Sequence, residues 1–282
     1  MDTVNGVYTL LDGNKIPEIG FGTWQIEGER AAEAAAEAVR AGYRHIDTAA
    51  AYENEEAVGA GIKRSGIRRE ELFITTKLWN NVRGYEETIA ACEESMKKLG
   101  TDYLDLYLIH WPNPLKFRSC WKEKNADTWR AFEELQRSGK VRSIGVSNFC
   151  PRHLDALLET AEVIPAVNQI RLCPGDVDDE TVSYCRSKGM LPEAYSPLGR
   201  GMAFESEAIK DIAAKYGRSV SQICLRWCLQ KGFLPLAKAT SPQHMAENLR
   251  LYDFELESAD LNALSMMTGE CGVHSNPDEK PF

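Results

Sequence analysis

An acid and a phenol lie close together in the chain, directly after an apolar segment. Asp47 and Tyr52 are five positions apart, and they follow Tyr43-Arg44-His45-Ile46. A free tyrosine has a pKa of about 10, so it exchanges protons at neutral pH only where a nearby cation favours the phenolate. Lys77, at the end of the next apolar segment, is the candidate cation. The spacing therefore predicts an acid–base site built from a phenol, an ammonium and a carboxylate.

The overall composition limits the classes of molecule that such a site can bind. The chain has 282 residues, of which 43% are hydrophobic and 27% charged, and its formal net charge is -9. This is the composition of a globular protein with a large core, and the acidic balance lacks the basic surface of a nucleic-acid binder or a membrane-surface helix. We expect a small-molecule partner, with no nucleic acid and no membrane.

The termini, cysteines and histidines exclude other classes. Residues 1–5 lack the basic and apolar regions of a signal peptide, and no apolar segment approaches the roughly 20 residues of a membrane span, so a cytoplasmic protein is expected. Eight cysteines are scattered without a Cys-x-x-Cys motif, which favours buried or incidental thiols. Five histidines show neither the pairing nor the clustering of zinc ligands, so no metal site is predicted.

Short apolar segments alternate with longer amphipathic ones along the whole chain. Eight strands are expected, at 19–21, 43–46, 72–76, 104–109, 141–146, 166–169, 190–194 and 233–236. Helices are expected between and after them, at 29–41, 53–65, 85–99, 126–138, 152–159, 178–187, 206–216, 220–230 and 258–267. Eight strand–helix units of this length predict an α/β fold, a single (β/α)8 TIM barrel that fills residues 1–282 as one domain.

Two further features refine this fold. Residues 7–10 and 15–17 flank Asp12-Gly13-Asn14, which predicts an N-terminal β-hairpin that closes the bottom of the barrel. The rival fold, an open sheet that binds a dinucleotide, requires a Gly-x-Gly-x-x-Gly turn after a strand. The nearest approach is Gly59-Ala60-Gly61, which lies inside a helical pattern, so a cofactor would have to bind in another way.

In a barrel of this kind, the residues that follow neighbouring strands share one catalytic face. Asp47, Tyr52, Lys77 and His110 all lie at such strand ends. Asp47 would keep Lys77 charged, and the ammonium would lower the pKa of the phenol, while His110 could orient a carbonyl oxygen. Each residue alone is commonly a cap, a surface group or a core residue. Their joint position favours a catalytic site.

Several longer motifs occur in order along the chain. They are Gly42-Tyr43-Arg44-His45-Ile46-Asp47-Thr48-Ala49 with Tyr52, Thr76-Lys77-Leu78-Trp79, Tyr103-Leu104-Asp105-Leu106-Tyr107-Leu108-Ile109-His110-Trp111-Pro112, Gly145-Val146-Ser147-Asn148-Phe149, Asn168-Gln169, Ala194-Tyr195-Ser196-Pro197-Leu198 and Glu247-Asn248. Together they resemble the signatures of the aldo-keto reductase family, from about Gly20 to the last helix. The resemblance implies a carbonyl reductase in which NADPH delivers hydride to an aldehyde or ketone and Tyr52 donates the proton.

The resemblance also implies binding roles. Ser147, Asn148 and Gln169 would hold the nicotinamide carboxamide and Tyr195 would stack on its ring. The full set of implied cofactor contacts is Gly22, Thr23, Trp24, Asp47, Ser147, Asn148, Gln169, Tyr195, Ser196, Leu198, Gly199, Lys238, Ala239, Thr240, His244, Glu247 and Asn248. The substrate would meet Trp24, Tyr52, Trp79, His110 and Trp111. Segments 113–125, which contains Trp121, and 269–282 are expected to form loops over this face.

The phosphate end of the implied cofactor site departs from the family pattern. Relatives commonly have Pro-Lys-Ser and then an Arg that faces the 2'-phosphate, whereas this chain has Ala237-Lys238-Ala239-Thr240 and His244. A neutral histidine cannot grip a phosphate in bidentate fashion, so NADP(H) is expected with NAD(H) also possible.

Two other functions and the assembly state remain to be weighed. Lys77 would suit a Schiff-base aldolase, although that chemistry leaves Ser147, Asn148, Gln169 and Tyr195 without a role. A non-catalytic, NADPH-binding regulatory barrel is the other alternative. A monomer is expected, and the sequence does not name the substrate.

Overall fold

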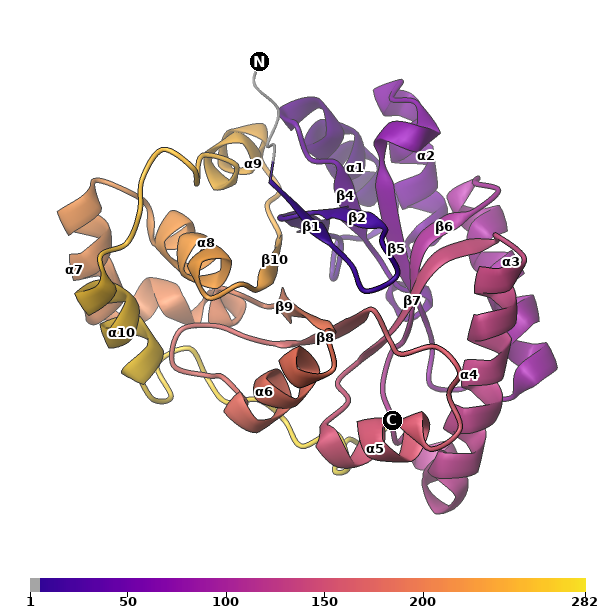
Figure 1. Cartoon of the computed structure of the whole chain (residues 1–282). Helices are drawn as coiled ribbons and strands as arrows, with labels where there is room; N and C mark the ends of the chain where they lie inside the picture. The colour runs from indigo at the N-terminus through magenta and orange to yellow at the C-terminus, as the bar shows by residue number, and fades with distance from the viewer. Residues whose placement is uncertain (1–5) are drawn as a thin grey trace.

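A computed structural model of the chain describes residues 6–282, so the expectation about residues 1–5 lies outside the described part. Eight parallel strands close into a barrel in the order β10-β3-β4-β5-β6-β7-β8-β9 (Figure 1). They are β3 (Gly20–Gly22), β4 (His45–Asp47), β5 (Phe73–Leu78), β6 (Leu104–Ile109), β7 (Val141–Ser147), β8 (Val167–Arg171), β9 (Leu191–Tyr195) and β10 (Leu234–Ala237). The eight predicted strands are confirmed, each to within two residues at either end.

Helices cover the outside of the barrel. They are α1 (Gly28–Ala41), α2 (Glu55–Ser65), α3 (Tyr85–Leu99), α4 (Trp121–Arg137), α5 (Pro151–Leu158), α6 (Asp179–Ser187), α7 (Glu207–Tyr216), α8 (Val220–Gln230), α9 (Pro242–Asn248) and α10 (Ser258–Met266). Two of them differ from expectation. Helix α4 begins five residues earlier than predicted, and α9 was not predicted. Within residues 6–282, no helix is long and apolar enough to cross a bilayer.

The predicted hairpin is present and closes one end of the barrel. Strands β1 (Val7–Thr9) and β2 (Lys15–Pro17) pair antiparallel and lie across the barrel in Figure 1. Leu10 and Ile16 are buried in one cluster with interior residues of β6, β8 and β10. The Asn14 amide donates to the carbonyl oxygen of Arg142, at 3.1 Å, beside the start of β7. The hairpin therefore supplies an apolar floor to the barrel.

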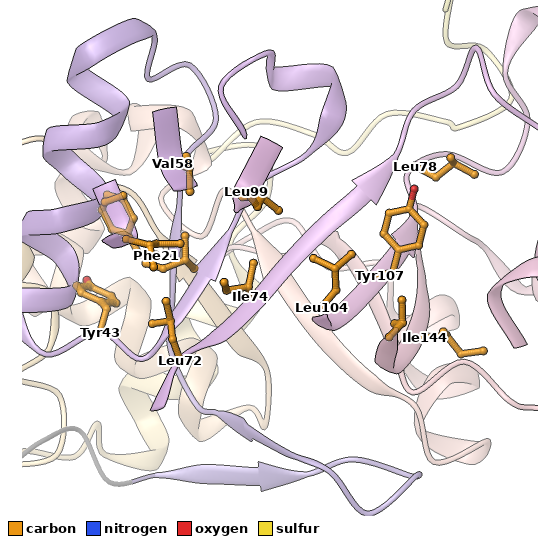
Figure 2. Close-up of a cluster of buried hydrophobic side chains, with 14 of the residues drawn as sticks. Phe21, Tyr43, Val58, Leu72, Ile74, Leu78, Leu99, Leu104, Tyr107 and Ile144 are labelled. Carbon is orange, nitrogen blue, oxygen red and sulfur yellow. The ribbon is translucent and has the colours of Figure 1, made fainter. Parts of the chain in front are cut away.

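Strand β6 shows why the barrel strands are rich in apolar residues on both faces. Leu106 and Leu108 pack in the interior cluster above the hairpin, whereas Tyr107 and Ile109 pack outward in the larger cluster beneath the helices. Figure 2 shows this outer layer, in which side chains of neighbouring strands meet Val58 and Leu99 of the covering helices. Both faces of a parallel strand are covered, so both carry mostly apolar side chains.

The ends of helix α3 lie where its sequence favours them. Helix α3 has Glu86 and Glu87 in its first turn and Lys97 and Lys98 in its last, so all four charges complement the helix dipole. It ends at Gly100, whose φ of 66° is the left-handed conformation that glycine adopts without strain.

Close packing of α1 against α2 depends on a glycine. A Cβ atom added at Gly61 would lie 2.2 Å from the carbonyl oxygen of Ala32, which is backbone and cannot turn aside. We predict that Gly61→Ala lowers the free energy of unfolding by about 1–3 kcal/mol, because the two helices must separate. Chemical denaturation measures this. The exposed Lys63→Ala on the same helix is the control, and it should change stability by less than ~0.5 kcal/mol. Equal effects of the two substitutions would contradict the packing argument.

Candidate active site

The four predicted catalytic residues meet at the end of the barrel opposite the hairpin. Asp47 is the last residue of β4, Tyr52 ends the short 3-10 helix η1 (Ala50–Tyr52), Lys77 lies near the end of β5, and His110 directly follows β6. Strands β4, β5 and β6 are neighbours in the barrel. Parallel pairing therefore brings together four side chains that span more than sixty positions of sequence.

A buried ion pair is the centre of this group. The Lys77 Nζ atom lies 2.7 and 2.8 Å from the two carboxylate oxygens of Asp47, and it also donates to the carbonyl oxygen of Thr48 at 2.8 Å. Neither residue is more than 2% exposed. Burial opposes the charge on Lys77, but Asp47 and Tyr52 favour it more strongly, and the pKa of Lys77 is raised. Lys77 is therefore an ammonium ion.

Tyr52 lies against this ammonium. Its Oη atom is 3.4 Å from Lys77 Nζ, and the ammonium also lies 5.1 Å from the centre of its ring. Burial raises the pKa of Tyr52, and the charge of Lys77 opposes this rise without cancelling it. The ammonium lowers the pKa of the phenol, as expected, but burial outweighs it, and sequence spacing carries no measure of burial. Tyr52 is a protonated phenol whose ionised form Lys77 stabilises.

His110 completes the group as an uncharged imidazole. Burial and the nearby cations Lys77 and Arg83 hold its pKa well below the ordinary value. The ring meets Tyr52 edge to face at 5.9 Å and Trp79 at 5.1 Å between ring centres. A neutral imidazole beside a phenol can orient a carbonyl oxygen by a hydrogen bond.

The residues expected at the nicotinamide form a second hydrogen-bonded group on the neighbouring strands. Gln169 Nε2 donates to Asp47 at 2.9 Å, and Ser147 Oγ donates to the Gln169 carbonyl oxygen at 2.7 Å. Tyr195 Oη donates to Asn148 Oδ1 at 2.8 Å. Side chains held in this way are fixed before any ligand arrives, as a binding site requires.

These groups surround one cavity of about 690 Å³. Fourteen of the predicted site residues line it, namely Gly22, Trp24, Asp47, Tyr52, Trp79, His110, Trp111, Ser147, Asn148, Gln169, Tyr195, Ser196, Leu198 and Lys238. Lys77 lies behind Asp47 and Tyr52, outside the lining. Seven predicted cofactor contacts also lie outside it: Thr23, Gly199, Ala239, Thr240, His244, Glu247 and Asn248.

Two parts of the molecule account for most of those seven. Residues 239–248 run from the end of β10 through α9, where His244 is exposed and Asn248 is buried. Thr23 is buried and donates to the Asp47 carbonyl oxygen at 3.0 Å, which makes it a support for β4. Their contacts with a cofactor stay predictions.

Sequence reasoning missed several residues of the lining. Arg200 and Lys280 are two cations in addition to Lys238. The ring of Phe282 lies 5.6 Å from that of Trp79 and 5.3 Å from that of Trp111, measured between ring centres. The expectation that the C-terminal segment covers the cavity is confirmed. Which of its residues enter could not be predicted, because no periodic pattern marks them. The rest of the missed lining is Gln25, Ala51, Pro197, Gly201, Phe204 and Leu236.

The expectation of a loop over the cavity at 113–125 is only partly right. Residues 115–120 form a 3-10 helix and Trp121 begins α4. The Trp121 ring packs on His153 at 5.0 Å between ring centres, outside the cavity lining. The helix predicted at 126–138 therefore extends toward the N-terminus as far as Trp121, whose ring packs on a buried imidazole.

Backbone strain gathers around the cavity. Gln25, Asn148, Ser196 and Arg200 have φ between 51° and 62°, in the left-handed region that residues other than glycine and asparagine rarely adopt, and all four line the cavity. Strain of this kind persists where the surroundings fix it, and it is common at functional sites. In residues 6–282, no group of three or more His, Cys, Asp or Glu side chains could hold a metal ion, and the eight cysteines are free thiols.

The comparison with protein families decides the classification. The model for the "Aldo/keto reductase family" matches residues 18–267. The chain belongs to this family. Among relatives of this aldo-keto reductase, the glyoxal reductase of Bacillus subtilis (strain 168) is 46% identical over 97% of the chain and 96% of its own length. The methylglyoxal reductase of Escherichia coli (strain K12) is 39% identical over 98% of both chains.

Solved structures support the same conclusion. The aldo-keto reductase of Bombyx mori in complex with NADP is 34% identical to this one, with a TM-score of 0.86, and the match covers 95% of this chain and 94% of the other. The Schiff-base alternative is disfavoured by the site itself. A Schiff base requires a neutral amine in contact with substrate, whereas Lys77 in this aldo-keto reductase is buried, charged and paired with Asp47.

The ion pair gives a test of how the site is held together. We predict that Lys77→Met lowers the free energy of unfolding by about 3–5 kcal/mol, because it leaves the Asp47 carboxylate buried without a partner. The double variant Lys77→Met/Asp47→Leu should be more stable than the single one, since both charges are then removed. Denaturant unfolding of both proteins measures this. A double variant less stable than Lys77→Met would contradict the ion-pair account.

Proposed function

We propose that the enzyme reduces small aldehydes and ketones to alcohols with NADPH and uses Tyr52 as the proton donor. One observation carries the proposal. The Tyr52 hydroxyl borders an aromatic cavity at 3.4 Å from an ammonium that is itself locked to Asp47. A carbonyl oxygen that receives a hydride on its carbon must gain a proton, and a phenol whose anion is stabilised by Lys77 can supply it.

The residues at the cavity fit a nicotinamide cofactor. When bound, the reduced nicotinamide would supply the hydride. Gln169 Nε2 already donates to two carboxyl groups, so its Oε1 atom would accept a hydrogen bond from the carboxamide. Tyr195 would stack on the ring, and Arg200 and Lys238 would face the phosphates. Both cations already lie near the face of Trp24, at 4.9 and 5.8 Å from the ring centre.

The proton-transfer steps follow from the chain's own groups. His110, as a neutral imidazole, would donate a hydrogen bond that orients the substrate oxygen toward Tyr52. Tyr52 would give its proton to that oxygen, and Lys77 would stabilise the phenolate that remains. Asp47 would hold Lys77 in place, since both of its oxygens contact the ammonium.

The cavity favours small carbonyl compounds. Its substrate end combines Trp79, Trp111 and Phe282, which narrow the space above His110. Two relatives are named for glyoxal and methylglyoxal, which are short 1,2-dicarbonyl compounds. We therefore propose 1,2-dicarbonyls as the first substrates to assay. The monomeric state and the cytoplasmic location stay predictions.

Removal of the phenol hydroxyl tests the assignment of Tyr52. We predict that Tyr52→Phe lowers kcat for methylglyoxal reduction by at least ~10²-fold, the usual contribution of a general acid, while NADPH still quenches tryptophan fluorescence. Tyr85→Phe, on the outer helix α3, removes a hydroxyl away from the cavity and is the control. Near-normal turnover in Tyr52→Phe would overturn the proposed function. Turnover of methylglyoxal by the unchanged enzyme in this assay would also exclude the non-catalytic alternative.

The choice between NADPH and NADH depends on the end of β10. Lys238 and Thr240 remain from the family pattern there, and His244 stands where relatives have Arg. The structure adds Arg30 of α1, whose guanidinium lies 3.5 Å from the Thr240 carbonyl oxygen. Both Arg30 and His244 are exposed, so neither provides a preformed bidentate clamp for a 2'-phosphate.

We propose that NADPH is preferred by less than about a hundredfold, which corresponds to ~2.7 kcal/mol of discrimination. His244→Arg should widen the preference, because a guanidinium can grip the 2'-phosphate with two hydrogen bonds. The measurement is kcat/KM for both cofactors at fixed substrate between pH 6 and 8, with the exposed Lys63→Arg as control. A preference for NADPH over NADH of a hundredfold or more in the unchanged enzyme would refute the proposal that its 2'-phosphate is bound weakly.

A further inference from the structure

A second carboxyl group lies in the barrel interior, next to the catalytic ion pair. Glu193 of β9 is 0% exposed, and Gln169 Nε2 donates to its Oε2 atom at 2.8 Å. The same nitrogen donates to Asp47 at 2.9 Å, so a single amide group joins the two carboxyl groups. The reaction proposed above gives Glu193 no role.

The surroundings of Glu193 contain few charges. Asp47 and His45 approach it from β4, Lys77 from β5 and Gln169 from β8, and Tyr52 lies above. Only Lys77 is cationic. If both Asp47 and Glu193 were ionised, one negative charge would remain uncompensated in a region closed to water, and such a charge is costly.

His45 does not supply the missing positive charge. Its Nε2 atom lies 3.8 Å from Glu193 Oε1 but only 2.9 Å from the hydroxyl of Thr75. A Cβ atom at Gly20 would come within 2.6 Å of His45 Nδ1, so the ring is closely packed on its other side. Burial and the Lys77 charge lower the pKa of His45 to about 3. The imidazole is therefore neutral.

We propose that Glu193 stays protonated in the working enzyme and acts as a positioning residue, which fixes the Gln169 amide and keeps the charge beneath Tyr52 balanced. Gln169 donates to Oε2, but Oε1 receives no hydrogen bond from residues 6–282, so the geometry leaves a negative charge on this carboxyl group only half stabilised and favours the acid form. Burial and Asp47 together raise the pKa of Glu193 to about 8.

Loss of this proton to solvent has a catalytic consequence, which rests on the proposed function of Tyr52. An ionised Glu193 adds a negative charge below the phenol and raises its pKa further. Alcohol oxidation, the reverse reaction, requires the phenolate. When Glu193 is ionised, the kcat of alcohol oxidation therefore increases only at a higher pH.

The first test measures stability and does not depend on activity. In the unfolded chain Glu193 ionises near pH 4.5, and in the folded protein it keeps its proton up to about pH 8. Above pH 4.5 the unfolded state thus binds fewer protons, so stability falls as pH rises and becomes constant again above pH 8. Glu193→Gln keeps the shape and cannot ionise. The Tm of Glu193→Gln minus the Tm of the unchanged enzyme should therefore increase between about pH 5 and pH 8.

The second test detects the proton directly. The infrared spectrum of the unchanged enzyme at pH 7 should contain the C=O stretching band of a protonated carboxyl group, and Glu193→Gln should lack it. Glu133→Gln is the matched control, because Glu133 is also buried but binds backbone N–H groups of residues 162 and 163 on the outside of the barrel. A spectrum without this band, together with parallel Tm curves, would overturn the proposal.

The third test concerns catalysis. With benzyl alcohol and NADP+, the midpoint of the kcat–pH curve should move down by at least ~0.5 pH unit in Glu193→Gln, because a like charge near Tyr52 is removed. Glu133→Gln should leave the midpoint unchanged. An unshifted midpoint in Glu193→Gln would refute the link to Tyr52. If Tyr52→Phe retains turnover, the proposed function fails, and the Tm and infrared tests still decide the protonation of Glu193.

Discussion

The ion pair between Lys77 and Asp47 constrains everything around it. Two charges removed from water cost several kcal/mol unless their hydrogen bonds are complete. Both Asp47 oxygens contact the ammonium, Thr48 supplies a carbonyl oxygen, and Gln169 donates from the far side of the barrel. Asp47 and Lys77 lie on the adjacent strands β4 and β5, whereas Gln169 lies on β8, so the hydrogen bonds of the pair are complete only when the barrel is closed. The pairing of β4 with β5 also brings Tyr52, five residues after Asp47, to the ammonium.

The barrel interior is divided into two layers with different physical roles. Near the hairpin, Leu10, Ile16 and the inward residues of β6, β8 and β10 exclude water. Toward the open end, the interior is polar and holds Asp47, Lys77, Gln169 and Glu193, and His45 lies between the two layers, where its ring packs on Phe73 of the apolar cluster. The apolar layer keeps the polar layer in a poorly solvated environment, where each charge is felt strongly. Burial is accordingly the largest cause of the pKa shifts of Tyr52, His110 and Glu193.

Sequence patterns predicted the strands, and the meeting of Asp47, Tyr52, Lys77 and His110 at one end of the barrel, because both follow from local rules. Apolar segments of five or six residues such as 104–109 indicate buried strands, and a parallel barrel brings the ends of those strands together. The direction of the Tyr52 pKa shift was not predictable, since it depends on burial by distant segments. Glu193 was missed for the same reason, because one acid in an apolar strand gives no sign that Asp47 lies nearby. Lys280 and Phe282 belong to an irregular segment without a repeating pattern.

The two sides of the cavity are built from different kinds of structure. The acid–base group is attached to strand ends, whereas Trp79 and Trp111 stand on loops that a buried arginine joins. Arg83 donates to the carbonyl oxygens of Trp79, Val82 and Trp111, at 3.1, 2.6 and 2.6 Å, and burial lowers its pKa to about 9. Neutral carbonyl oxygens do not cancel its charge, so Arg83 also favours a neutral His110. One side chain thus joins the two loops of the aromatic wall and helps to keep the imidazole uncharged.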